Sequence, residues 1–216
     1  MKPTTLDRGL TRLLVSATLA ALSTACSEPA RSDRSPAFLV IEMLEAASGA
    51  EPEQFGNVLN SDVETIIEQQ TNGQSIEVPN VFSDSGRATF RLGLKNPGTS
   101  TNPMTPSPLN EITITRYRVA FRRADGRSTP GLDVPYPFDG AVTLTVPAEG
   151  ATSVTFALVR HQAKLEPPLS RLRRGGSGNI ISTIAEVTFY GRDQAANDVA
   201  VGGLLSVNFG DFADPR

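Results

Sequence analysis

Hydrophobic and polar residues alternate along most of the chain after residue 36, and this period of two predicts β-strands. In the clearest run, Arg87–Lys95, the side chains of Ala88, Phe90, Leu92 and Leu94 share one face, and most of those between them are charged or polar. Further strands are expected at 37–44, 142–146, 154–158, 181–189 and 199–209. The pattern predicts one β-rich domain over residues 37–216.

One predicted strand changes phase partway along its length. In the segment 111–123, Ile112 and Ile114 alternate on one parity, whereas Tyr117 and Val119 alternate on the other. A β-bulge between the two pairs would bring both sets to the same side, because it inserts one extra residue into a strand. We therefore expect a single bulged strand here.

Glycine and proline mark the connections between strands. Asn72-Gly73 is a strong hairpin signal, and Gln74–Val78 resumes the alternation after it. The preceding segment has one helix-like feature, because Ser61 and Glu64 have capping-box spacing; a hairpin is the preferred interpretation. Longer connections are expected at 46–60, 96–110, 129–140 and 164–179.

The predicted fold class is all-β. Because no helical period separates the strands, we expect antiparallel pairing, about 8–9 strands, and two sheets that share one core. The long proline-rich connections suit strands that cross from one sheet to the other, which favours a sandwich over a barrel.

The N-terminal stretch differs from the rest of the chain. Lys2, Arg8 and Arg12 precede the apolar run in Leu13–Cys26, which ends in small residues and a cysteine, the layout of a secretory signal. It resembles a bacterial lipoprotein signal, which implies cleavage after residue 25, acylation of Cys26 and a polar tether over 26–36. A transmembrane helix or a buried core helix are the alternatives, but the run is shorter than the about 20 residues that a membrane span needs.

The lipoprotein resemblance also implies a location. Cys26 is the single cysteine of the chain, and acylation would remove an otherwise free thiol from an exported protein. Ser27 follows it, which by the enterobacterial sorting rule implies the outer membrane. The formal net charge of −3 does not favour a nucleic-acid partner, which calls for a basic surface.

A second resemblance lies between the last two predicted strands. In Tyr190–Asp198, the residues Asp193, Ala195 and Asn197 match the terminal hairpin of bacterial immunoglobulin-like repeats, with Ala196 in place of the usual glycine. The resemblance implies an immunoglobulin-like β-sandwich. The alternative is a water-stress-type sandwich, to which the strand ending in Asn96-Pro97 is similar.

Candidate chemistry is sparse. His161 is the single histidine and is expected on a solvent-facing strand end, and no nucleophile or phosphate-loop motif occurs. We expect no cofactor and no catalytic residue. Asp193, Asn197 and Asp198 could offer oxygen ligands to calcium, but bonding within their own turn is the preferred interpretation. No zinc or other metal site is expected.

The function expected from the sequence is a non-enzymatic, lipid-anchored binding or assembly module of the cell envelope. Its candidate partner surface combines Tyr136 and Phe138 with three arginines, Arg171, Arg173 and Arg174. An envelope protein or an anionic polysaccharide would suit this surface. The alternative is a carbohydrate-active or other hydrolytic lipoprotein that uses a carboxylate pair.

Overall fold

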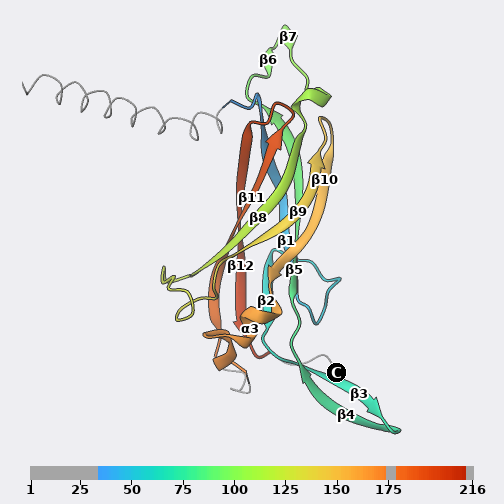
Figure 1. The fold of residues 1–216 in the computed structure, drawn as a ribbon, viewed down its shortest axis with the longest axis vertical. Helices are drawn as coiled ribbons and strands as arrows, with labels where there is room; N and C mark the ends of the chain where they lie inside the picture. Colours follow the sequence, from blue (N-terminus) through green and yellow to red (C-terminus); the bar gives the residue numbers. More distant parts are fainter. Residues whose placement is uncertain (1–33, 174–178, 213–216) are drawn as a thin grey trace, which may run out of the picture.

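The structure is a computed structural model, and it describes residues 34–173 and 179–212. This part of the chain is almost entirely β-structure (Figure 1). Its twelve strands are β1 (Ala37–Ala47), β2 (Val58–Asp62), β3 (Thr65–Thr71), β4 (Gln74–Asn80), β5 (Asp84–Leu94), β6 (Gly98–Thr99), β7 (Asn102–Pro103), β8 (Ile112–Arg123), β9 (Phe138–Val146), β10 (Ala151–Val159), β11 (Ile181–Asp193) and β12 (Asp198–Gly210). The short helices are η1 (Pro108–Asn110), α3 (His161–Leu165) and η2 (Leu169–Arg171). No helix within the described residues has the length and apolar character needed to cross a membrane.

Two sheets form the body of the molecule. A curled five-stranded sheet has the order β2-β12-β11-β8-β9, and a three-stranded sheet has the order β1-β5-β10. The all-β prediction is confirmed, but the predicted number of strands, the two-sheet arrangement and the wholly antiparallel pairing differ from the structure, in which the described strands form four sheets and the largest is a curled, mixed one. There are twelve strands in the described part, because β3–β4 and β6–β7 form separate hairpins. The pairing is also mixed rather than wholly antiparallel, because β2 runs parallel to its neighbour β12.

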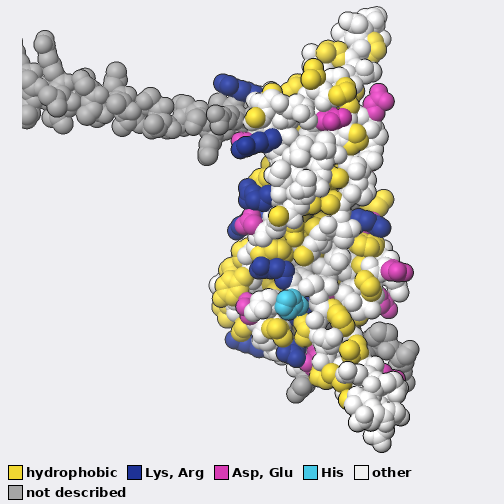
Figure 2. Space-filling view, turned by 45° about the vertical axis from the view of Figure 1, so that its right-hand side comes forward, with side chains coloured by type: hydrophobic (Ala, Val, Ile, Leu, Met, Phe, Trp, Pro, Cys, Tyr) yellow, Lys and Arg dark blue, Asp and Glu magenta, His cyan; other side chains and the backbone are white. Residues whose placement is uncertain are grey.

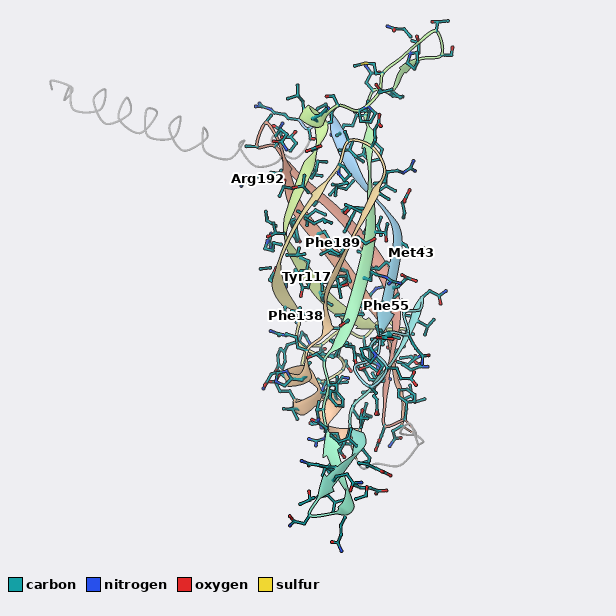
Figure 3. All side chains as sticks on the ribbon, turned by 90° about the vertical axis from the view of Figure 1, so that its right-hand side faces the viewer. Met43, Phe55, Tyr117, Phe138, Phe189 and Arg192 are labelled. Atoms are coloured by element: carbon teal, nitrogen blue, oxygen red, sulfur yellow. The ribbon has the colours of Figure 1, made fainter. Side chains whose placement is uncertain are left out.

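Aromatic rings fill the space between the two sheets (Figure 3). Phe90 of β5 meets Phe189 of β11 edge-to-face, with ring centroids 4.9 Å apart. Phe156 of β10 contacts Phe189 at 5.2 Å and Tyr117 of β8 at 5.0 Å. These four side chains are at least 94% buried, so the alternation predicted for β5, β8, β10 and β11 points to one shared core.

The two local predictions of irregular backbone are confirmed. The β8–β9 register shifts between Ile114 and Arg116, so that Ile112, Ile114, Tyr117 and Val119 are all buried. Asn72 and Gly73 have φ angles of 52° and 78°, the left-handed values that a tight hairpin turn requires. The hairpin interpretation of residues 65–80 was therefore correct.

The molecule is elongated and has two ends, which we call proximal and distal (Figure 1). The proximal end is where β1 begins, and it also carries the β6–β7 hairpin and the β11–β12 turn. The distal end carries the β3–β4 hairpin, the loop between β8 and β9, and α3 with η2. The longest strands have 13 residues, so the two ends of the body lie about 43 Å apart at ~3.3 Å per residue.

The β11–β12 turn is held by one carboxylate. Asp193 Oδ1 accepts hydrogen bonds from the backbone N–H groups of Ala195 (2.9 Å) and Asn197 (2.8 Å), and its Oδ2 accepts one from Asn197 Nδ2 at 2.8 Å. Ala196, at the tip, has a φ of 62°. This is the position where the resembling hairpins have glycine, and a Cβ atom is unfavourable in that backbone region.

Ala196→Gly is expected to raise the free energy of unfolding by about 0.5–1 kcal/mol, because relief of the left-handed strain outweighs the added freedom of the unfolded chain. Ala195→Gly is the matched control: Ala195 has no positive φ, so this change should lower stability by about 0.4–1 kcal/mol. Urea unfolding of the three proteins measures both effects. Destabilisation by both glycines would contradict the strain at Ala196.

Candidate functional site

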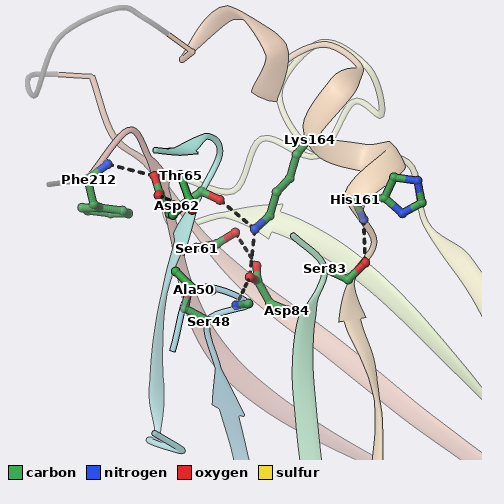
Figure 4. A network of polar contacts seen from close by, with 11 residues as sticks. Ser48, Ala50, Ser61, Asp62, Thr65, Ser83, Asp84, His161, Lys164 and Phe212 are labelled. Atoms are coloured by element: carbon green, nitrogen blue, oxygen red, sulfur yellow. Dashed lines mark hydrogen bonds and ion pairs between the residues drawn. The ribbon is translucent and has the colours of Figure 1, made fainter. Parts of the chain in front are cut away.

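A buried ion pair lies at the distal end, where the two sheets and α3 meet (Figure 4). Lys164 Nζ is 2.8 Å from Asp84 Oδ1, and the two side chains are 1% and 0% exposed. Lys164 also donates a hydrogen bond to the backbone oxygen of Asp62 at 2.7 Å. Lys164, which lies in α3 after β10, thereby connects this helix to β5 and to β2.

Asp84 has further donors around it. Its Oδ2 accepts a hydrogen bond from Ser61 Oγ at 2.6 Å, and its Oδ1 accepts one from the Gly49 backbone N–H at 2.9 Å. Burial raises the pKa of the Asp84 carboxyl, and the charge of Lys164 acts against that rise. Each charge thus offsets the cost of burying the other.

Two neighbouring acidic residues extend the network toward the chain segments around it. Asp62 Oδ2 accepts a hydrogen bond from Thr65 Oγ1 at 2.7 Å, and its Oδ1 accepts one from the Phe212 backbone N–H at 3.1 Å. Glu64, which is 4% exposed, accepts both Nε and a second guanidinium nitrogen of Arg173. We call this set a structural clamp, because its hydrogen bonds and ion pair join β2, β5 and α3.

Sequence reasoning missed this clamp. Lys164 lies three residues after His161, and Asp84 lies three residues before the clear run Arg87–Lys95. Neither residue belongs to a recognisable motif. His161 itself is exposed, and its backbone N–H donates to Ser83 Oγ at 3.0 Å. Its imidazole points away from the buried pair (Figure 4).

The loop between β8 and β9 is the best-defined exposed apolar surface at the distal end. Leu132 and Tyr136 are 60% and 52% exposed, whereas Val134 and Phe138 are 1% and 7% exposed. The Thr129 carbonyl accepts backbone hydrogen bonds from positions 132, 133 and 134. The loop is therefore anchored by every second apolar residue and presents the others to solvent.

Gly131 allows the tyrosine of this loop to lie flat against the backbone. Its φ is 76°, and a Cβ atom there would lie 2.4 Å from the Tyr136 hydroxyl oxygen. Only glycine fits this contact. The hydroxyl end of Tyr136 thus packs against the Gly131 backbone, while the side chain stays half exposed.

The residues predicted to bind a partner lie in different environments in the structure. Tyr136 is exposed as expected, but Phe138 is a core residue that starts β9, packs on Tyr117 at 6.2 Å and is covered by the guanidinium of Arg160. Its expected place on the surface was wrong, because the strand parity turns it inward. Arg171 is exposed on η2. Arg173 forms an ion pair with Glu64, so part of its guanidinium is already bound within the protein.

Two further predicted residues, Arg174 and Cys26, lie outside the described residues, as do the signal and most of the tether. The described parts of the two predicted loops, 129–140 and 164–173, lie toward the same end of the molecule (Figure 1). The structure therefore brings Tyr136 and Arg171 to one end. Their binding role stays a prediction.

The outer face of the five-stranded sheet carries arginines that have acidic partners. Asp139 accepts hydrogen bonds from Arg116 (2.9 Å) and Arg118 (2.7 Å), and Arg122 pairs with Glu186 at 2.6 Å. Figure 2 shows several dark blue side chains beside magenta ones on the visible face. These side chains are exposed and solvated, and ion pairs of this kind contribute little to stability.

The candidate calcium residues are used within their own turn. Both carboxylate oxygens of Asp193 accept hydrogen bonds from the turn, and Asp198 pairs with Arg192 at 2.8 Å. Burial alone would raise the pKa of Asp193, but the hydrogen bonds from Asn197, Ser35 and Ala195 outweigh it and lower the pKa. Within residues 34–173 and 179–212, no three His, Cys, Asp or Glu side chains gather as a metal site would require.

A hollow of about 430 Å³ opens at the base of the β3–β4 hairpin. Its lining comes from the loop after β1, from β3 and from the segment before β5: Gly49, Ala50, Thr65, Ile66, Ile67, Glu68 and Phe82. Gly49 is also a donor to Asp84. The hollow therefore borders the clamp on its solvent side.

Comparisons of this chain with protein-family models, with curated proteins and with solved structures found no match. The functional argument therefore rests on the residues and their geometry.

Lys164→Met and Asp84→Leu are each expected to lower the free energy of unfolding by about 3–5 kcal/mol, because each leaves a buried charge without its partner. The double variant should lose less than the sum of the two. Arg91→Ala is the control, since it breaks the exposed 2.7 Å pair with Glu42 and should cost less than about 1 kcal/mol. Additive losses in the double variant would show that the two charges do not support each other.

Proposed function

We propose that this protein is a non-enzymatic, lipid-anchored binding or assembly module of a bacterial cell envelope, acylated at Cys26. One observation carries the proposal: β1 begins at the proximal end, and the exposed loop with Leu132 and Tyr136 lies at the opposite end. An anchor at Cys26 would hold the first end near the membrane. The second end would then face away from it, toward a partner.

The order of the strands supports a variant of the immunoglobulin-like sandwich. With β5 as strand B and β11–β12 as the final F–G hairpin, the sheets take the orders A-B-E and G-F-C-C′, with β2 added beside β12. The Phe90–Phe189 contact would occupy the place of the B–F disulfide, and Tyr117 that of the tryptophan on strand C. Sandwiches of this kind present binding loops at their ends.

The loop with Leu132 and Tyr136 has the properties of a prearranged contact surface. Its backbone is closed by internal hydrogen bonds, and Val134 is fixed in the core. Ordering such a loop on binding costs little conformational entropy. Arg171 at the same end adds a guanidinium for a carboxylate or phosphate group, so an acidic protein face or an anionic polysaccharide fits this surface.

The anchor is tested by the location and mass of the protein. Wild-type protein should sediment with membranes and carry acyl mass on a mature N-terminus at Cys26, and Ser27 favours the outer membrane. Cys26→Ser should give either released protein or uncleaved precursor, because the thiol is the acylation site. Soluble, cleaved wild-type protein without acyl mass would contradict the proposal.

The distal surface is tested by photo-crosslinking in intact cells. A photoreactive residue at Tyr136 should form adducts with an envelope protein or polysaccharide, and one at Leu204 should not, although Leu204 is 62% exposed on the side of the molecule. Leu132→Ser combined with Tyr136→Ser should weaken partner capture and change stability by less than about 1 kcal/mol. Equal adducts at positions 136 and 204 would contradict a distal binding surface.

A further inference from the structure

The connection between β5 and β8 projects from the proximal end, and its residues between Lys95 and Glu111 carry no charge. We call residues 96–110 the proximal protrusion; this stretch contains no Asp, Glu, Lys or Arg. The tip at the top of Figure 2 shows only hydrophobic and uncharged atoms, and acidic side chains appear a short way below it. Met104 and Leu109 are 56% and 78% exposed, and Leu109 is the most exposed of the large hydrophobic residues in the described part of the chain.

Internal hydrogen bonds order this protrusion. The Met104 N–H donates to the Pro97 carbonyl at 2.9 Å, and the Asn102 N–H donates to Thr99 Oγ1 at 3.1 Å. At its other side, the Ser107 N–H donates to Asn110 Oδ1 at 2.9 Å. Several of its backbone donors are thus already paired, which lowers the cost of removing them from water.

The protrusion starts where the N-terminal segment joins the body. The Lys95 N–H donates to the Pro36 carbonyl at 2.9 Å, and Ala37 pairs with Leu94. Cys26 lies ten residues before Pro36, and ten residues reach at most about 35 Å when fully extended. As a flexible chain they would span about 18 Å on average.

We propose that the proximal protrusion is a membrane-contact surface, with Met104 and Leu109 in the interfacial layer of the bilayer that holds the acyl chains. This inference rests on the proposed acylation of Cys26. A tether this short keeps the protrusion at a high effective concentration near the lipid, so two apolar side chains are sufficient for a stable contact. Because the protrusion has no charge, its insertion removes no ion from water.

Contact of the protrusion with lipid also sets the orientation of the whole domain. The protrusion and the β1 start give two separate attachments at one end, and the long strands transmit that orientation to the other end. The loop with Leu132 and Tyr136 then points away from the bilayer surface.

The experiment uses full-length acylated protein reconstituted in vesicles of phosphatidylethanolamine and phosphatidylglycerol. Met104→Cys and Leu109→Cys each introduce one free thiol, because the single native cysteine is acylated, and each is labelled with an environment-sensitive fluorophore. Nitroxide-bearing lipids should quench both labels at least about twofold more than a label at Leu204→Cys on the side of the domain. The quenching should change little between low and high salt, since residues 96–110 themselves carry no charge.

The outcomes separate this inference from the proposed function. Acyl mass and membrane association, together with unquenched, water-exposed labels at 104 and 109, would overturn the contact surface and leave the anchor intact. Labels shielded from water but not reached by lipid quenchers would overturn it in favour of a contact between copies of this chain, since no other protein is present in the vesicles. Protein without acyl mass would overturn the anchor, and the membrane contact with it.

Discussion

The distal end depends on the contact between Lys164 and Asp84. Two buried charges are costly unless each neutralises the other, and here they come from α3 and from the first residue of β5. Ser61 on β2 and the Gly49 backbone complete the coordination of the carboxylate. This one carboxylate therefore fixes how four chain segments meet, and those segments carry the β3–β4 hairpin and the start of the α3–η2 region.

The aromatic core and the clamp hold the two sheets together by two different kinds of interaction. Phe90, Phe156, Tyr117 and Phe189 meet in the middle of the body and supply non-directional apolar burial. The clamp lies at one end and supplies directional hydrogen bonds. Apolar packing alone would leave the relative position of α3 and β2 loosely specified, whereas the lysine can satisfy Asp84 and the Asp62 carbonyl only from one place.

The two ends of the domain suit two different surroundings. The proximal end has an uncharged protrusion with exposed Met104 and Leu109, next to the start of β1. The distal end has an ordered loop with exposed Leu132 and Tyr136, together with the exposed Arg171. Long strands separate these surfaces, so a contact at one end does not obstruct a contact at the other. The proposed anchored module is built on this separation of the two ends.

The sequence alone determined the local structure, because strand alternation and turn residues are properties of neighbouring positions. The bulge in β8, the Asn72-Gly73 hairpin and the inward face of β5 all follow from side-chain parity and from backbone preferences. The tertiary structure alone decided the parallel β2–β12 pair, the burial of Phe138 and the clamp around Asp84. Each of these depends on residues far apart in the chain: Lys164 and Asp84 are 80 positions apart, and no local pattern records which distant charge a buried lysine will meet.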